Sequence, residues 1–466
     1  MKNKIRIGCG AGFSGDRIEP AIVLAEKGKL DYLVLECLAE RTIALANKRK
    51  MADPAQGYDP LLERRIETLL PHLVKNNIRL ITNMGAANPI EGAKKIIEIA
   101  KKQGITIKVT AVSGDDVSEK LKAKSERFSI FGNENFAIDL IDEYQSPFTH
   151  HLSPIVSANA YLGVDGILEA LKADAQIIIT GRVADPSLFL APMIHEFGWA
   201  TDDYDLMGKG TVIGHLMECA GHITGGYFAD PIKKPVENMD NLGHPFADVF
   251  ADGSAVISKV EGTGGIINLQ TAKEQLLYEV INPNEYYTPD VIADFTSVKL
   301  EEIAQNQVRV TGGSGKEKPS TYKVSVGYKA FWQGEGEISY AGPAAYERAK
   351  LAGEIIKNRS PLTPNGGIFD EIKIDFIGIN STFTEDILVK ASPSGAGWAD
   401  VRVRIAAKAQ TQADAALIGE EIEALYTNGP AGGGGVRKYI NEVIGILSVL
   451  VDRKKIKPVV EYFESR

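Results

Sequence analysis

The first half of the chain alternates short apolar runs with helical patterns, and this alternation constrains the fold more than any other feature of the sequence. Helical stretches such as IEGAKKIIEIAKKQG and GILEALKAD separate the runs. Strands that are apolar throughout and alternate with helices form a parallel sheet covered on both faces. We therefore expect an α/β fold, with an open doubly wound sheet preferred over a barrel. The runs are KIRIGCG (4–10), DYLVLECL (31–38), IRLITNMG (78–85), ITIKVTAVSG (105–114), SPIVSANA (153–160) and AQIIITGR (175–182).

The pattern changes at about Asp240. Segments such as GSAVISKV, NQVRVTGG, TYKVSVGYKAFW and EGEISYAG then predict strands with few long helices between them, and helical patterns return from about residue 345. We expect two domains: a parallel α/β domain over 1–235, which carries the polar strand ends, and an α+β region over 236–466 with a mixed sheet and C-terminal helices.

The charge of the chain excludes some classes of partner. Its net charge is −9 and its pI is near 5.5, whereas binding to nucleic acid or to an anionic membrane needs a basic surface. No run of apolar residues is long enough for a membrane span or a signal peptide, and three cysteines cannot form a disulfide framework. These features predict a cytoplasmic protein with a small-molecule or acyl-CoA partner, and we also expect a homo-oligomer.

Polar residues and glycines follow each apolar run, and in a parallel sheet such strand ends share the edge at which ligands bind. The first of these ends, GCGAGFSGDR (8–17), leads into a predicted helix over 19–27. A tight turn before a helix N-terminus favours an anion, so a phosphate or carboxylate site is one interpretation. The alternative is a sharp turn without a ligand. The candidate substrate-binding residues here are Gly10, Gly12, Ser14, Asp16 and Arg17.

Glu36 ends a run that is otherwise apolar. A buried carboxylate costs several kcal/mol unless it meets a cation, a hydrogen-bond donor or a ligand. Glu36 is therefore a candidate catalytic residue, and an ion pair with Arg17 is the structural alternative.

Two further strand ends, TNMGAANP and TGRVADPS, contribute candidates. Asn83, Asn88 and Arg182 are expected to bind substrate, with Arg182 as a bidentate clamp for a carboxylate or phosphate. Asp185 is a candidate catalytic residue, and an Arg182–Asp185 brace within the turn is the alternative.

The segment GHLMECAGHITGGYF has the spacing that would place His215, Glu218, Cys219 and His222 on one face of a helix. His215, Glu218 and His222 are candidates both for general acid–base catalysis and for a divalent metal site, and a polar network between helices is the third interpretation. The spacing is not that of HExxH zinc proteases. The cofactor question stays open, with a divalent metal as one answer.

Several long blocks resemble the acyclic terpene utilisation protein A (AtuA) family over most of the chain. They are IRIGCGAGFSGDR, YLVLECLAERT, GYDPLLERR, ITNMGAANP, TGRVADPSLFLAPMIHEFGW, GHLMECAGHITGGYFADP, KEQLLYEV and GEGEISYAGP. Some members of this family carry a further C-terminal ferredoxin-like module, which we do not expect in this chain.

The resemblance implies catabolism of citronellol-type and geraniol-type terpenes, and a carbon–carbon lyase that releases an acetyl unit from a branched 3-hydroxyglutaryl-CoA. CoA would then be part of the substrate. Such a retro-aldol reaction needs a base and a sink for the enolate. His215 or His222 are candidates for the base, and Arg182 with the first turn for the sink. The alternatives are a metal-assisted hydro-lyase or hydrolase acting on small hydroxy or carboxylic acids, and a non-catalytic binding subunit.

Overall fold

The computed structural model describes residues 2–121, 127–130, 133–139, 155–360, 369, 371–382 and 400–465. The described residues form two compact units. The first lies within Met1–Pro147, Ile155–Gly327 and Ile446–Arg466, and the second within Tyr328–Gly445.

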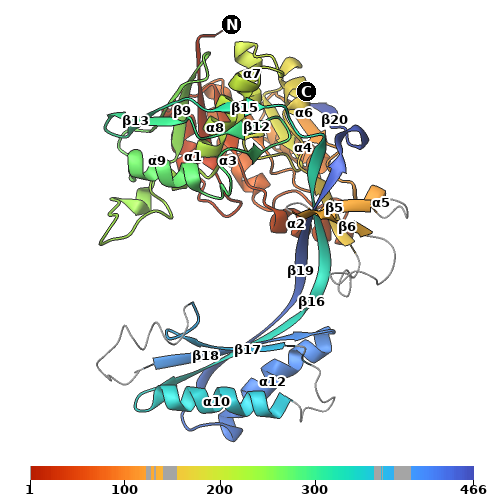
Figure 1. Ribbon diagram of the computed structural model, residues 1–466, viewed down its shortest axis with the longest axis vertical. Coiled ribbons are helices and arrows are strands. Elements are labelled where there is room, and N and C mark those ends of the chain that lie inside the picture. Colours follow the sequence, from red (N-terminus) through yellow and green to blue (C-terminus); the bar gives the residue numbers. More distant parts are fainter. Residues whose placement is uncertain are drawn as a thin grey trace. The chain divides into compact units, whose positions relative to one another are not determined.

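A ten-stranded sheet organises the first unit (Figure 1). Its central strands run parallel, in the spatial order β1-β2-β3-β8-β4. Strand β8, the last of these in the sequence, therefore lies between β3 and β4. The bounds of the central strands are β1 Lys4–Ala11, β2 Tyr32–Leu35, β3 Arg79–Thr82, β4 Lys108–Ser113 and β8 Ile177–Thr180. The sheet is open, which confirms the predicted α/β class.

Side chains of β2 show why both faces of this sheet are covered. Leu33 and Leu35 point into one hydrophobic core, and Tyr32 and Val34 point into another on the opposite face, as the two-residue period of a strand requires. The first core is closed by α1 (Glu19–Lys27), α3 (Leu62–Lys75) and α4 (Pro89–Lys102), and the second by α6 (Asp165–Lys172), α7 (Ser187–Phe197) and α8 (Tyr204–Glu218). The result is a three-layer α/β/α arrangement. Helix α2 (Glu40–Ala52) follows β2.

Antiparallel strands extend both edges of the parallel core. Beyond β1 lie β9 (Pro245–Phe250), β10 (Ala255–Lys259), β14 (Gln307–Thr311) and β13 (Lys299–Ala304), and β20 (Val459–Glu464) pairs with β4. The change of pattern near Asp240 thus marks a change from parallel to antiparallel strands within one sheet. The remaining elements here are α5 (Ser118–Leu121), β5 (Arg127–Ile130), β6 (Asn133–Asp139), α9 (Leu269–Leu277), β11 (Tyr286–Tyr287), β12 (Ile292–Asp294) and β15 (Ser314–Lys316).

One predicted member of the parallel sheet lies elsewhere. The run SPIVSANA forms β7 (Ile155–Ala160), which pairs with β16 (Thr321–Ala341) and not with the central strands. Its alternate positions explain this: Ser157 and Asn159 are buried polar residues, and Asn159 donates to Asp115 (2.8 Å) and accepts from Asn47 (3.0 Å). The central strands are instead apolar on both faces. The prediction of a sixth parallel strand was wrong.

The second unit has a βαββαβ topology. It uses part of β16 (Thr321–Ala341), then α10 (Ala345–Arg359), β17 (Glu371–Ile377), β18 (Asp400–Ala409), α12 (Gln412–Asn428) and part of β19 (Gly434–Asp452). The strand order β17-β18-β16-β19 is that of ferredoxin-like folds. Helices α10 and α12 lie on one face of this sheet and share a hydrophobic core with it (Figure 1). The sequence did not predict this internal unit.

Among the described helices, none combines the length and the apolar character that a membrane span requires.

Candidate functional site

The carboxyl ends of β2, β3 and β8, together with the end of α8, carry a group of polar side chains that we call the strand-end cluster. Its members come from four elements that are far apart in the sequence. Burial is deep: Arg182 is 2 % exposed and His215 is 1 % exposed, and the Asp185 side chain is the most accessible at 31 %. The cluster consists of Glu36, Asn83, Arg182, Asp185, His215 and Glu218.

Glu36 is held by hydrogen bonds and not by an ion pair with Arg17. Its Oε1 accepts from Asn83 Nδ2 (2.7 Å) and from the backbone N–H of Leu38 (2.9 Å), while Asn83 Oδ1 accepts from the backbone N–H of Cys37 (2.7 Å). Arg17 instead donates to the backbone carbonyl of Asp240 (3.3 Å). Asn83 therefore orients Glu36, a positioning role that the sequence interpretation, which expected it to bind substrate, did not include.

Arg182 is the positive centre of the cluster. Its Nη1 lies 3.0 Å from Asp185 Oδ1, and the guanidinium also donates to the backbone carbonyl of Leu38. The Tyr161 ring stacks on it, with 4.0 Å between the guanidinium carbon and the ring centroid. The Arg182–Asp185 pairing that the sequence offered as an alternative is thus present. It does not use the whole guanidinium, since Arg182 Nε has no hydrogen-bond partner.

Glu40, the first residue of α2, provides a negative charge near Arg182. It accepts from the Tyr161 hydroxyl and lies 3.2 Å from Lys323 Nζ. Burial alone would raise the pKa of Glu40, but the charge of Arg182, the bond from Tyr161 and the charge of Lys323 outweigh it and lower the pKa to about 2. Glu40 is therefore a permanent carboxylate at neutral pH.

The other carboxyl groups behave in the opposite way. Burial raises the pKa of Glu36 well above its usual value, and the charge of Asp185 adds to this while Arg182 opposes it. Burial likewise raises the pKa of Glu218, again with a contribution from Asp185, and burial raises the pKa of Asp185 although Arg182 opposes it. Three carboxyl groups share one arginine, so they can hold and release protons nearer neutral pH than ordinary carboxyl groups do.

His215 and Glu218 form a pair at the end of α8. His215 Nδ1 lies 2.9 Å from Glu218 Oε1, and the rings of Tyr286 and Phe295 flank the imidazole at 5.3 and 5.4 Å between centroids. Burial lowers the pKa of His215 to about 4, so the ring is neutral at pH 7.

Buried polar atoms without hydrogen-bond partners concentrate in this region. They are Arg182 Nε, Asp185 Oδ1, His215 Nε2, Glu218 Oε2 and, on α9, Gln275 Oε1. The amide nitrogen of Gln275 donates to the His215 carbonyl (3.0 Å), and Asp185 Oδ1 lies in the ion pair with Arg182. Since buried polar groups in proteins are normally hydrogen-bonded, such a concentration is typical of a site that binds a polar ligand.

The prediction that His215, Glu218, Cys219 and His222 share one helix face was wrong. Helix α8 ends at Glu218, Ala220 has a positive φ of 43°, and His222 lies in a 3₁₀ turn, stacked on Tyr227 at 5.3 Å. The chain is closely packed at this helix end, since a Cβ on Gly12 would lie 2.4 Å from the carbonyl carbon of Cys219.

His222 is consequently separated from the His215–Glu218 pair. In the part of the chain that the structure describes, no three His, Cys, Asp or Glu side chains are placed to hold a metal ion. The three candidate ligands therefore do not fit a divalent metal.

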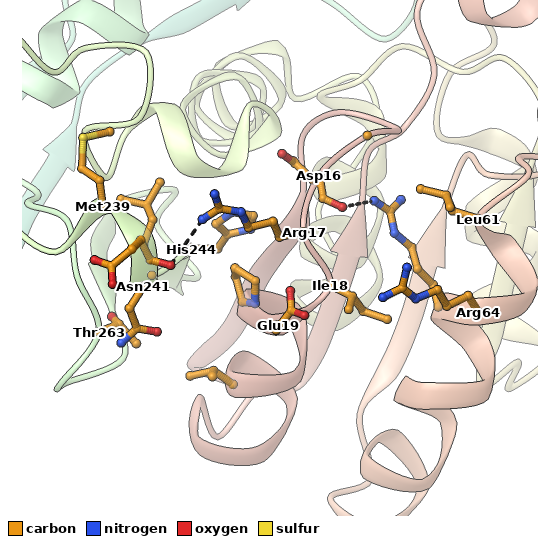
Figure 2. A pocket seen from close by; sticks show the side chains of 17 residues that line it. Asp16, Arg17, Ile18, Glu19, Leu61, Arg64, Met239, Asn241, His244 and Thr263 are labelled. Carbon is orange, nitrogen blue, oxygen red and sulfur yellow. Dashed lines mark hydrogen bonds between the residues drawn. The ribbon is translucent and has the colours of Figure 1, made fainter.

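The glycine-rich turn borders a pocket of about 890 Å³. The turn, the start of α1, α3 and the segment from Met239 to His244 form its walls, and Figure 2 shows the side chains that line it. Of the predicted residues, Asp16 and Arg17 line this pocket. Glu36, Arg182 and Glu218 belong to the strand-end cluster instead, so the predicted residues divide between two neighbouring places.

The other residues of the turn have structural partners. Gly10 packs where a Cβ would lie 2.7 Å from the Leu35 side chain. Ser14 donates to Asp59 (2.6 Å), and Asp16 Oδ2 accepts from the backbone N–H of Gly12 (2.8 Å).

The side-chain amide of Asn88 is also hydrogen-bonded within the protein. Its Nδ2 donates to the backbone carbonyls of Pro54 (2.9 Å) and Gln56 (2.8 Å), so it ties down the loop between α2 and α3. The structure gives it a structural contact, and its predicted role in substrate binding stays a prediction.

Sequence reasoning missed several residues around both places. Around the strand-end cluster they are Glu40, Tyr161, Gln275, Tyr286 and Lys323, and in the pocket they are Arg64, Arg65 and His244. Arg65 had a detectable signal, because helical spacing places it among the buried residues Leu62, Ile66 and Leu69. Lys323 had none, since its contact with Glu40 joins positions 283 residues apart.

Comparisons with known proteins identify the family. The model of the family described as "Acyclic terpene utilisation family protein AtuA" matches residues 5–462. No curated protein and no solved structure matches the chain in the comparisons made. Because the match extends over nearly all of the sequence, the chain belongs to the acyclic terpene utilisation AtuA family, which implies a role in the use of acyclic terpenes.

Proposed function

We propose that the chain is a carbon–carbon lyase that cleaves a branched 3-hydroxyacyl-CoA and releases an acetyl unit. The observation that supports this proposal most is the strand-end cluster: a neutral histidine paired with a carboxyl group, and two further carboxyl groups with raised pKa values around one buried arginine. The family supports a role in acyclic terpene utilisation, and the branched 3-hydroxyacyl-CoA is the substrate that this resemblance implies.

The reaction needs three groups. A base takes the proton of the 3-hydroxyl group, the C2–C3 bond breaks as C3 becomes a ketone, and the bonding electrons form the enolate of the acetyl unit. An acid then delivers a proton to C2 of that enolate. A nearby positive charge or hydrogen-bond donor stabilises the enolate.

His215 is the best candidate for the base. Its neutral ring can accept a proton at Nε2, which has no hydrogen-bond partner, while Nδ1 faces Glu218. When the imidazolium forms, Glu218 Oε1 accepts a hydrogen bond from Nδ1, and the new positive charge favours ionisation of this carboxyl group, whose pKa burial raises in the resting site. His222, the other histidine considered, lies outside this pair.

The acid and the enolate sink come from the rest of the cluster. Asp185 is the most exposed carboxyl group and has a raised pKa, so it is the candidate that returns the proton. Arg182 Nε is an unused donor on a permanent cation and can face the enolate oxygen.

The metal-assisted hydro-lyase or hydrolase receives no support from the geometry, because its proposed ligands, His215, Glu218 and His222, do not gather. A non-catalytic binding subunit is the other alternative, and the absence of turnover of every ester tested would favour it.

The proposal is tested by incubating the purified chain with a panel of branched 3-hydroxyacyl-CoA esters, including 3-hydroxyglutaryl-CoA derivatives. Acetyl release and the ketone co-product are measured together by mass spectrometry. His215→Asn and Glu218→Gln are expected to lower kcat by about 10²-fold to 10⁴-fold, as loss of a general base does. Glu91→Gln, at a solvent-accessible position on α4, is the matched control and should keep full activity. Absence of acetyl release from every ester, or full activity in His215→Asn, would contradict the proposal.

A further inference from the structure

Three guanidinium groups surround the pocket beside the glycine-rich turn, those of Arg17, Arg64 and Arg65. In the described part of the chain, none of them forms an ion pair with a carboxylate. Carboxyl groups of Asp16, Glu19 and Asp240 also line the pocket, but they lie outside ion-pairing distance of the three arginines.

Arg65 carries the strongest argument, because it is buried and forms no ion pair with any residue that the structure describes. It is 3 % exposed, and its guanidinium donates to the carbonyls of Ser14 (3.0 Å) and Asp16 (2.8 Å) and to the Cys37 sulfur (2.9 Å). Burial raises the pKa of Cys37 well above its usual value, so this sulfur is a neutral thiol. The direct partners of the guanidinium are therefore all neutral, and the carboxylates of Asp16 and Asp59, which act on the same sulfur, form no ion pair with the guanidinium. A buried charge without an ion-pair partner is costly, and an anion in the adjoining pocket would offset that cost.

Arg17 and Arg64 approach the same pocket from the turn and from α3 (Figure 2). Arg17 has one long contact, to the Asp240 carbonyl at 3.3 Å, and the Arg64 guanidinium has no partner among the described residues. Planar guanidinium groups bind phosphate through paired hydrogen bonds. The start of α1 contributes less, since Glu19 adds a negative charge there and Pro20 lacks an N–H.

We infer that this pocket binds the nucleotide phosphates of an acyl-CoA, an inference that rests on the proposed function for the choice of ligand. Its volume of about 890 Å³ is that of a site for a nucleotide-sized ligand and exceeds what one inorganic phosphate would fill. Phosphates, unlike the single carboxylate of a small acid, present enough oxygens for three guanidinium groups.

The position of the pocket suits a CoA ester. Gly12 lies against Cys219 at the end of α8, directly after Glu218 of the strand-end cluster, and Asp16 lines the pocket. Four residues of chain span at most about 14 Å, so the pocket and the cluster are near neighbours. In CoA the long pantetheine arm separates the phosphates from the thioester. Phosphates held here would leave the acyl group free to reach the cluster.

The test is calorimetric titration of the full chain with CoA, 3′,5′-ADP, inorganic phosphate and glutarate. CoA and 3′,5′-ADP are expected to bind with one site per chain, more tightly than inorganic phosphate, and more weakly as salt rises. Arg17→Gln and Arg64→Gln should each weaken 3′,5′-ADP binding about tenfold, because each removes a charged hydrogen-bond donor. Both positions are exposed, so these variants should fold. Arg309→Gln is the control. Arg309 is an exposed arginine on β14 that pairs with Glu301 on the neighbouring strand β13 and does not line the pocket, so this variant should leave binding unchanged.

Two results would overturn this inference: 3′,5′-ADP that binds equally to wild type, Arg17→Gln and Arg64→Gln, or glutarate that displaces 3′,5′-ADP and binds more tightly. The second result would assign the pocket to a substrate carboxylate. Failure of the lyase proposal is a separate observation. CoA binding that depends on the arginines, without turnover, would support CoA binding in this pocket and contradict the lyase proposal. Turnover with an unchanged KM in both arginine variants would support the lyase proposal and contradict CoA binding in this pocket.

Discussion

Replacing His215 by Gln should flatten part of the pH dependence of stability. Burial lowers the pKa of His215 to about 4 in the folded chain, against about 6.5 for an unfolded histidine. Between these values the unfolded chain binds the proton and the folded chain does not, so stability is present above pH 6.5 and is lost as the pH falls. At pH 5 the difference amounts to about 2 kcal/mol of the free energy of unfolding, since each pKa unit corresponds to about 1.4 kcal/mol.

The assay is urea unfolding of wild type and His215→Gln at pH 7.5 and pH 5. Glu36 and Glu218 act in the opposite direction, because carboxyl groups with raised pKa values take up protons in the folded chain and gain stability on acidification. Both remain in the variant, so the comparison of the two proteins isolates the histidine. The wild type should lose about 2 kcal/mol relative to the variant on going to pH 5. Equal pH dependence in the two proteins would refute the buried neutral state of His215.

Other substitutions test the packing around the site. Asn83→Ala removes one of the two hydrogen bonds to the Glu36 carboxyl group and leaves the backbone N–H of Cys37 without a partner, and it should lower the free energy of unfolding by about 3 kcal/mol in urea titrations; a loss below about 1 kcal/mol would contradict the positioning role. Gly12→Ala places a Cβ 2.4 Å from a backbone carbonyl carbon at the end of α8, and a destabilisation of about 2 kcal/mol is expected from thermal unfolding. Gly434→Ala, where a Cβ meets nothing within 4 Å, is its control, and an equal effect of both would argue against close packing at the turn.

The central sheet could be predicted from sequence because its strands are apolar on both faces. Runs such as Tyr32–Leu35 leave no other arrangement than a covered parallel sheet, and the predicted helix over 19–27 has the bounds of α1. A parallel sheet also predicts that the polar strand ends lie at one edge, and the structure does bring Glu36, Asn83 and Arg182 together.

In the second half, two predicted strand segments belong to one strand. The sequence predicts TYKVSVGYKAFW and EGEISYAG as separate strands, but β16 runs through both without interruption. A Cβ on Gly334 would lie 1.9 Å from the Ala415 carbonyl and one on Gly336 would lie 2.4 Å from Ile422, so these glycines let α12 approach the strand. A glycine that breaks a strand and one that admits a helix look alike in a single sequence.

The prediction that a helix continues from His215 to His222 was wrong for a related reason. The spacing of His215 and His222 continues a helical pattern, but the helix ends at Glu218, next to Cys219, against which Gly12 packs from more than 200 residues away in sequence. The partners of Arg182 likewise depend on tertiary contacts, since Glu40 begins α2 and Tyr161 follows β7.

The most direct measurement of the proposed chemistry is the isotope content of the acetyl unit released in D₂O from a branched 3-hydroxyacyl-CoA. Cleavage through an enolate protonated by the strand-end cluster predicts one solvent deuterium in each acetyl methyl group, and loss of this product in Glu218→Gln. An acetyl unit without solvent deuterium, or undiminished product formation by Glu218→Gln, would contradict it.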